Sequence, residues 1–478
     1  MRFDFYAVRI WELSDRFLLD IGPPHRSRAV LDELRTIKGG PLLPNLRRCI
    51  VTDCGFPHSQ CDAIHFVLRV SPPSLTSVTL SVFEDSDAGS MRDRLLALAM
   101  GCPALQSLQI EMEFETVGLD LLADMVPRWP KLHLFALHML SIGDDNTAMR
   151  TAFASDQLLH ALSELPALEW LSIQEPSQWS DEDRTDQGDA PTNHTYIFPA
   201  LRHLVIGTCH AMTAKKLLST ISSPALRELR LAGSDPAFLT SLLPVIQQHS
   251  SADALLELWV GPNGAEIPGR ALSGAAPNAI AAFTLRPLMR LNAIQVLSLT
   301  CSRGPPYTTL LTSDEDWEAF APAWTHLRHL FITDSRYEDM PAQATVRTLI
   351  CLAKHCPDLE HVSMTLGEPG VYQNRPHNSG QSSSNSRSDS SEDVNIDGDL
   401  LPIQTKLTRL DLQYSSFSDA HVKVVARILA RVFPKLHRIT HFDDTNLLSH
   451  QGRRWGVALW PKRVDWDELL HLINQYRL

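Results

Sequence analysis

The chain has 478 residues and a formal net charge of −12, with 44% hydrophobic and 21% charged residues. This is the composition of a globular protein with a sizeable core, and the acidic balance without a long Lys/Arg cluster argues against binding to nucleic acid or a membrane surface. No apolar run reaches the roughly 18 residues of a membrane span, Asp4 and Glu12 interrupt a signal sequence, and eight cysteines are too few for a disulfide scaffold. We therefore expect a cytoplasmic or nuclear protein.

Residues 1–43 carry an imperfect copy of a unit that recurs in the rest of the chain. The segment Tyr6–Leu13 (YAVRIWEL) predicts a degenerate first strand, residues 29–38 predict its helix, and the Gly-Gly-Pro at residues 39–41 predicts the end of that helix. A repeat array needs an atypical terminal unit, because its outer face has no neighbour. We predict that residues 1–43 form this N-terminal cap.

From residue 44 onward the chain repeats a phrase of the form P-x-L-x-x-L-x-L. Apolar residues that alternate with polar ones predict a short strand with one buried face, and the leading proline suits the corner before a strand. Examples are PALQSLQI at Pro103 and PALRELRL at Pro224. The phrases begin at Pro44, Pro73, Pro103, Pro130, Pro166, Pro199, Pro224, Asp253, Asn292, Thr325, Pro357, Thr405 and Pro434.

Between the phrases, apolar residues spaced by three and four predict helices. A strand followed by a helix, repeated about 13 times over residues 44–440, predicts an α/β leucine-rich-repeat solenoid. In such a horseshoe, which is ribonuclease-inhibitor-like, parallel strands line the concave face and helices the convex face. The predicted helices include residues 91–100, 119–129, 237–248, 345–355 and 419–433. The residues expected to stack in one buried column are Leu80, Ile110, Ile206, Leu231 and Leu299.

The leucine-rich consensus also places asparagine or cysteine at the bend after each strand, where its side chain satisfies backbone groups. Most repeats lack it here, and Ser415 is one of the weaker substitutes. We therefore expect the turns to be closed in another way.

Two segments interrupt the repeats. Residues 175–196 predict an acidic loop, and the serine-rich residues 367–398 predict a disordered insertion, because such compositions cannot bury enough apolar surface to become ordered. The insertion contains Ser390 and Ser391 directly before two acidic residues. This pattern is typical of acidophilic kinase sites and makes both serines candidate phosphorylation sites.

The last segment, residues 441–478, predicts a C-terminal cap. An amphipathic helix is predicted from Asp465 to Tyr476. Trp455, Trp460 and Trp466 precede or begin this helix, and we interpret them as the core of the cap rather than a binding site.

The sequence contains no phosphate-binding loop, no GxGxxG after a strand, no GxSxG and no HExxH. The best metal candidate is the cluster of Cys54, His58, Cys61 and His65. Its residue types suit zinc, but its spacing differs from that of familiar zinc knuckles, so we interpret its cysteines as core residues. Cys351 and Cys356 receive the same interpretation, because Cys356 repeats the place of Cys102 before a phrase. We predict no enzymatic activity and no cofactor.

The candidate binding surface is the concave face, where the residues between the buried positions of each strand should project. Aromatic side chains at positions where polar ones are expected, next to arginine, are typical of interface hot spots. The alternative is that the long insertions fold over them. The candidate residues are Trp170, His203, Arg230, Trp259, His329, Phe331, His361 and Arg409, and Glu228 and Asp411 fall in the same rows.

The proline-initiated units, the Cys-Pro-x-Leu segments at Cys102 and Cys356, and the N-terminal RFDFYAVRIWEL leading to GPLLPNLRR resemble fungal F-box/leucine-rich-repeat proteins, in particular the basidiomycete set. The resemblance covers essentially the whole chain. It implies an adaptor whose F-box binds Skp1 in a cullin-RING ubiquitin ligase and whose repeats capture a substrate. An F-box should precede Phe3, and the sequence has none there, so we expect Skp1 as a partner only if an F-box exists upstream.

Three hypotheses follow. The leading one is a monomeric protein-interaction solenoid that binds a protein substrate on its concave face and serves an SCF-type ubiquitin ligase. The alternative is a leucine-rich-repeat scaffold that works without a ligase. The third is a zinc-dependent enzyme or zinc-stabilised domain built on the cluster that begins at Cys54.

Overall fold

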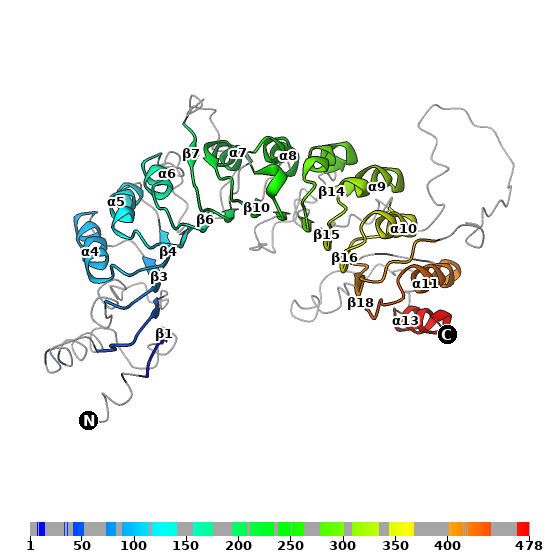
Figure 1. The fold of residues 1–478 in the computed structure, drawn as a ribbon, viewed down its shortest axis with the longest axis horizontal. Helices are drawn as coiled ribbons and strands as arrows, with labels where there is room; N and C mark the ends of the chain where they lie inside the picture. Colours follow the sequence, from blue (N-terminus) through cyan, green and yellow to red (C-terminus); the bar gives the residue numbers. More distant parts are fainter. Residues whose placement is uncertain are drawn as a thin grey trace, which may run out of the picture. The chain divides into compact units, whose positions relative to one another are not determined.

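The structure, a computed structural model, consists of two compact units, residues 1–254 and residues 255–478 (Figure 1). Each unit alternates strands with helices along the chain. The structure describes residues 7, 9–14, 33, 36, 42–51, 73–82, 88–113, 117–140, 156–174, 194–207, 211–233, 238–249, 251–261, 278–300, 308–333, 344–367, 401–413, 415, 417, 419–440 and 466–477.

The first unit contains a parallel sheet with helices on one of its faces (Figure 1). The strands, in their order across the sheet, are β1 (Glu12–Ser14), β2 (Arg48–Val51), β3 (Ser77–Val82), β4 (Ser107–Glu113), β5 (Leu134–Leu140), β6 (Trp170–Gln174), β8 (His203–Gly207) and β10 (Glu228–Ala232). The helices are α4 (Ala88–Gly101), α5 (Val117–Met125), η3 (Val126–Arg128), α6 (Asp156–Ser163), α7 (Ala211–Thr220), α8 (Phe238–Gln248) and η6 (Ala252–Ala254). A separate parallel pair joins β7 (Tyr196–Ile197) to β9 (Ile221–Ser222).

The second unit repeats the same arrangement. Its parallel sheet has the order β11 (Glu257–Gly261), β13 (Val296–Thr300), β15 (His329–Thr333), β16 (His361–Ser363), β17 (Arg409–Asp411) and β18 (Arg438–Thr440). The helices are η7 (Ala282–Arg290), α9 (Asp314–Phe320), η8 (Ala321–Ala323), α10 (Val346–His355), α11 (Asp419–Val432) and α13 (Trp466–Arg477). A separate parallel pair joins β12 (Asn278–Ala281) to β14 (Thr308–Leu311).

Each of the thirteen phrases forms a strand that begins four residues after the start of the phrase. The apolar positions explain why, because they carry the core. In the phrase at Pro224, for example, Leu226, Leu229 and Leu231 are all buried. The predicted column of Leu80, Ile110, Ile206, Leu231 and Leu299 is likewise buried. The α/β leucine-rich-repeat solenoid is therefore confirmed.

The turns before the strands are closed by the backbone. The carbonyl oxygen of Arg202 accepts hydrogen bonds from the backbone N–H groups of Arg227 (2.8 Å) and Glu228 (2.9 Å) in the next repeat. The same double acceptance recurs from repeat to repeat in both units, for instance at Arg328 in the second unit, whose carbonyl accepts from Glu360 and His361. Backbone groups at the start of these strands are thus satisfied by the preceding repeat.

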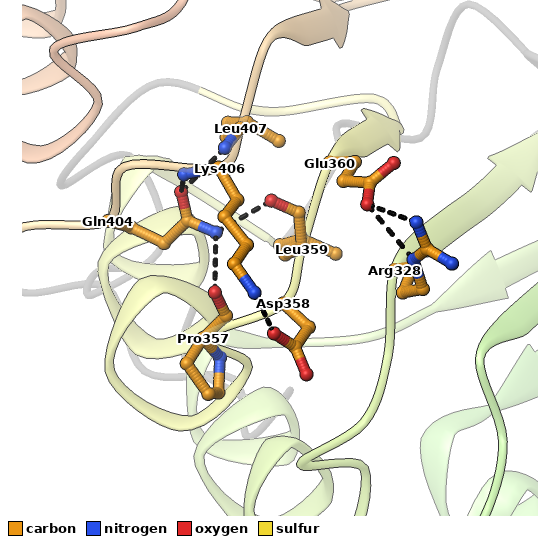
Figure 2. A network of polar contacts seen from close by, with 8 residues as sticks. All are labelled: Arg328, Pro357, Asp358, Leu359, Glu360, Gln404, Lys406 and Leu407. Carbon is orange, nitrogen blue, oxygen red and sulfur yellow. Dashed lines mark hydrogen bonds and ion pairs between the residues drawn. The ribbon is translucent and has the colours of Figure 1, made fainter.

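Gln404 closes the turn before β17, at the phrase that begins with threonine instead of proline (Figure 2). Its Oε1 accepts from the backbone N–H groups of Lys406 (2.8 Å) and Leu407 (2.6 Å), and its Nε2 donates to the carbonyl of Leu359 (2.6 Å) in the preceding repeat. An ion pair between Lys406 and Asp358 lies beside it. In the first unit, Ser223 plays a similar part, because its hydroxyl donates to the carbonyl of Leu201 (2.7 Å).

After β17, Gln413 and Ser415 close the bend. Gln413 has a φ of 40°, and its Nε2 donates to Ser363 Oγ (2.8 Å) and to the carbonyl of Ile332 (2.9 Å) two strands away. The Ser415 hydroxyl oxygen accepts from the N–H of Leu366 (2.7 Å). The role expected of Ser415 is therefore confirmed, whereas the bridging by Gln413 was not predicted.

The predicted helices from residue 91 onward agree with the structure to within a few residues, whereas nearly all of the predicted helix 29–38 lies outside the described residues. Some details differ. The predicted helix 119–129 ends as a 3-10 turn, η3, because Pro127 cannot continue an α-helix hydrogen-bond pattern. The strand of the predicted first unit, β1, spans Glu12–Ser14 and pairs with β2. The short pairs β7–β9 and β12–β14, and the 3-10 helix η7, were not predicted at all.

Several predictions fall outside the described residues. They are the zinc candidate Cys54, His58, Cys61 and His65, the serines Ser390 and Ser391, the tryptophans Trp455 and Trp460, and nearly all of both predicted insertions. Helix α13 is described and packs against α11, and its Arg477 Nη2 donates to the carbonyl of Phe433 (2.9 Å). Among the helices that the structure describes, none is long and apolar enough to cross a membrane.

Candidate protein-binding surfaces

In the parallel sheet of each unit, the first and third residues of the strands lie on the face opposite the helices, because side chains alternate along a strand and the second residues, with the fourth where the strand is long enough, are buried or half-buried on the helix side. We call this the open face of each unit. All eight residues predicted for the binding surface lie on it. The structure groups Trp170, His203 and Arg230 on the first unit, and Trp259, His329, Phe331, His361 and Arg409 on the second.

On the first unit, the parallel register places Trp170, His203 and Glu228 side by side as the first residues of β6, β8 and β10. The indole of Trp170 stacks on the imidazole of His203, with ring centroids 4.8 Å apart and an interplanar angle of 24°. The two rings cover part of each other, and both residues are only partly exposed.

Glu228 holds this cluster together. Its Oε2 lies 2.6 Å from His203 Nδ1, and its Oε1 pairs with Nε of Arg230. The Glu228 side chain is only 7% exposed, whereas those of His203 and Arg230 are 34% and 46% exposed. Glu228 lies in the predicted row, but its neighbours bury its side chain. A buried carboxylate is tolerable only when it is paired and hydrogen-bonded, and two cationic or polar partners provide that here.

On the second unit, aromatic rings gather around Phe331. Trp259 stacks on it with ring centroids 5.7 Å apart and an interplanar angle of 21°, and His361 meets it edge-on at 4.7 Å and 85°. In the sheet, Ser298 lies between Trp259 and Phe331. The serine side chain is small and buried, which leaves room for the two large rings to meet above it.

A row of basic and imidazole side chains runs past this aromatic group. The first residues of β15, β16, β17 and β18 are, in register, His329, His361, Arg409 and Arg438. Burial, together with the positive charges of Arg409, His329 and Arg438, lowers the pKa of His361 to about 4. His361 is therefore neutral near pH 7 and lies in a positive field.

The cations of this row lack partners among the described residues. There, Nε of Arg409 and Nε2 of His361 are buried atoms with no hydrogen-bond partner, and neither Arg409 nor Arg438 forms a salt bridge. The acidic groups on the same open face have other contacts. Asp411 Oδ1 accepts from the N–H of Gln413 (3.1 Å), and Glu257 Oε2 accepts from Nε1 of Trp259 (3.4 Å).

Arg438 was not among the predicted site residues, although the phrase contains the signal for it. It is the fifth residue of PKLHRITH, and the fifth residue of every phrase begins a strand and lies on the open face. Glu228 and Ser298 also occupy open-face positions of their strands, but the sequence carries no signal for their roles, because these depend on what the neighbouring repeats place beside them.

The described cysteines, Cys49, Cys102, Cys351 and Cys356, are all buried. Burial raises the pKa of Cys351 to about 11 and that of Cys356 to about 12. Their sulfur atoms lie 3.5 Å from the carbonyl of Trp317 and 3.8 Å from that of Ala321. The interpretation of Cys351 and Cys356 as core residues is confirmed. No group of three or more metal-ligating side chains occurs in the part of the chain that the structure describes.

Comparisons with known proteins add little beyond the repeat fold. No known protein family and no curated protein matches the chain. Similar solved structures include the leucine-rich repeat-containing protein LegL7 from Legionella pneumophila, with 12% identity, 88% of this chain and 95% of that chain covered, and a TM-score of 0.35. The Rad7 and Elc1 complex in yeast has 13% identity, with 90% of this chain and 90% of that chain covered and a TM-score of 0.34. The internalin inlF from Listeria monocytogenes has 11% identity, with 86% of this chain and 79% of that chain covered and a TM-score of 0.30. The likeness is too distant to assign a site.

Proposed function

We propose that the chain is a non-enzymatic protein-interaction module that binds a protein partner on the open face of its second unit. The observation that carries this proposal is the aromatic group of Trp259 and Phe331 on the same face as Arg409 and Arg438, which form no salt bridge with any described residue. Tryptophan and arginine dominate the binding energy of protein interfaces, and a strand face that exposes both is unusual for a surface that only meets water. The first unit contributes less, because its cluster satisfies its own charges.

At a finer level, we propose that this module recognises substrates for an SCF-type ubiquitin ligase in the cytoplasm or nucleus, as a monomer. The support is the resemblance of the repeats and of the N-terminal segment to fungal F-box/leucine-rich-repeat proteins. A scaffold without a ligase would use the same open face and is the second candidate. The two differ only in whether an F-box is present to bind Skp1.

Affinity capture with matched variants tests the binding surface. The wild-type chain and the W259S/F331S variant are used as baits, and recovered proteins are quantified by mass spectrometry. The control is F283S/M212S, which removes two exposed apolar side chains from the helices η7 and α7. We expect a partner recovered by wild type and control and lost with W259S/F331S, with all baits equally folded by circular dichroism. Equal recovery by all three baits would refute the open face as the binding surface.

A pull-down with Skp1 from the same organism tests the ligase. It uses this chain and a chain extended upstream in the genome. Binding by the extended chain supports the ligase adaptor, whereas no binding by either form leaves the scaffold. A zinc-dependent function is tested separately by the metal content of the purified chain.

A further inference from the structure

We infer that the open face of the second unit recognises an acidic peptide segment that carries an aromatic residue. This inference rests on the proposed function and names the chemistry of the partner. Four consecutive strands supply one row of side chains, His329, His361, Arg409 and Arg438, and the aromatic pair of Trp259 and Phe331 lies at one end of it.

The row presents positive charge that no carboxylate among the described residues neutralises. Within the described residues, Arg409 and Arg438 have no carboxylate partner, and Nε of Arg409 has no acceptor. Leaving the buried Nε of Arg409 without an acceptor costs free energy, and an incoming carboxylate that pairs with it and with the exposed Arg438 forms charge-assisted hydrogen bonds. The low pKa of His361 agrees with this arrangement, because burial and then the neighbouring cations oppose a further positive charge.

The geometry suits an extended peptide that lies across the strands. Neighbouring strands are about 4.8 Å apart, so Arg409 and Arg438 present their charges at a spacing that long acidic side chains on one face of an extended segment can span. The stacked rings of Trp259 and Phe331 give an aromatic residue of the same segment a surface to stack on. Glu257, at the far edge of the aromatic group, disfavours an acidic residue there, which places the acidic residues toward β17 and β18.

Charge selects a protein segment over nucleic acid as the occupant. The chain as a whole carries a net charge of −12, which repels a polyanion, whereas a short acidic segment needs only the local row. The first unit serves as an internal contrast. There Glu228 already neutralises Arg230, so the same acidic segment gains nothing comparable.

Peptide selection on the full chain tests the inference. Random 12-residue peptides are selected by phage display on the immobilised chain, and enriched peptides are measured by fluorescence anisotropy. The test variant is R409Q/R438Q. The control is R286Q/K423Q, which removes the same two charges from exposed sites on η7 and α11. Equal melting temperatures establish that all forms are folded.

We expect enriched peptides to combine several aspartates or glutamates with one aromatic residue. Their affinity should fall about tenfold in R409Q/R438Q, weaken with added salt, and stay unchanged in the control, as for charge pairs at a partly exposed interface. Enriched peptides that are not acidic but lose binding in W259S/F331S would refute this inference and leave the proposed function standing. Enriched peptides that bind W259S/F331S and R409Q/R438Q as tightly as the wild-type chain would refute both.

Two further outcomes would also refute the inference that the second unit recognises an acidic peptide segment of a partner. If peptides with aspartate or glutamate do not bind, and the same peptides with phosphoserine at those positions do, the site recognises phosphate rather than carboxylate. If acidic peptides bind only after residues 370–398 are deleted, the occupant is an acidic segment of this chain and not a partner.

Discussion

The two units place different chemistry on the same repeat positions. On the first unit, the Glu228 carboxylate binds both His203 and Arg230, and the cluster is complete in itself. On the second unit, Arg409 and Arg438 stand at the same strand position as Glu228 but have no carboxylate partner among the described residues. The charges on the first open face therefore pair with one another. Those of Arg409 and Arg438 on the second face are left for the acidic ligand that we propose.

This difference separates two uses of a repeated scaffold. The backbone, the buried leucines and the turn hydrogen bonds are nearly the same in the two units, so they account for the fold and not for binding. Specificity resides in the first and third residues of the strands, which the fold leaves free to vary. Substitutions in the shared core should therefore affect both units alike, whereas substitutions on the open faces should affect the two units differently.

The largest effect is expected from an acid in the shared core. Leu231 and Leu299 occupy the fourth position of β10 and β13, one in each unit, and both are buried. Leu231→Asp and Leu299→Asp should each destabilise their own unit by more than about 4 kcal/mol, because an unpaired charge enters the core. Urea unfolding measures the loss, and hydrogen exchange locates it. Leu→Met at each site should cost less than about 1.5 kcal/mol, and equal tolerance of aspartate would contradict the shared core.

A smaller effect is expected in the helix layer of the second unit. Asp314 Oδ1 accepts from the backbone N–H groups of Thr345 (2.8 Å) and Thr348 (3.1 Å) and from the Thr348 hydroxyl, and its Oδ2 accepts from the Thr345 hydroxyl (2.7 Å). Asp314→Ala removes all of these acceptors at the N-terminus of α10 and should cost about 2–4 kcal/mol in urea unfolding. Asp314→Asn keeps one acceptor oxygen and should cost less. If the alanine and asparagine variants are equally stable, Asp314 does not join α9 to α10.

The repeat explains how much of this could be predicted. The alternation of apolar residues in each phrase located thirteen strands, because burial of one strand face is a local property of the sequence. The contacts of Gln404, Gln413 and Asp314 were missed, because each joins residues more than 30 positions apart whose proximity depends on how long the helices and loops between them are.

For the candidate site, too, the sequence predicted the positions of the residues but not their contacts. The rows of open-face residues followed from the phrase, and Arg438 belongs to the same rule. Which side chains neutralise one another did not follow, because that depends on rotamers and on neighbours such as Ser298, whose small size lets Trp259 and Phe331 meet. Sequence patterns therefore identify a face, while contacts decide whether it is satisfied.

The Glu228→Gln variant tests whether the carboxylate accounts for the difference between the two open faces. Because His203 and Arg230 are partly exposed and can be solvated, loss of the charged bridge should destabilise the first unit by only about 1.5–2 kcal/mol in urea unfolding. The variant should also gain weak, salt-sensitive affinity for the acidic peptides that bind the second unit. Glu257→Gln is the matched control, since Glu257 also begins a strand, and it should change stability by less than about 0.5 kcal/mol. If Glu228→Gln is equally neutral, the first face is not held together by its carboxylate.

The smallest effect concerns the imidazole of His361. Its pKa is lowered from 6.5 to about 4 by burial, Arg409, His329 and Arg438, so between these pH values the unfolded chain binds more protons than the folded one. Stability is therefore complete above about pH 6.5 and falls as the pH drops toward 4, by about 1 kcal/mol at pH 5 after allowance for the partial exposure of the ring. The His361→Gln variant should lose this part of the acid sensitivity, which urea unfolding at pH 7 and pH 5 measures.

NMR titration measures the pKa of His361 directly. This pKa should be higher in R409Q/R438Q than in the wild-type chain, because the opposing charges are gone. It should also rise in the wild-type chain when an acidic peptide binds. A His361 pKa near 6.5 in the wild-type chain, unchanged in R409Q/R438Q, would mean that the second face carries no uncompensated positive charge and would remove the contrast between the two units.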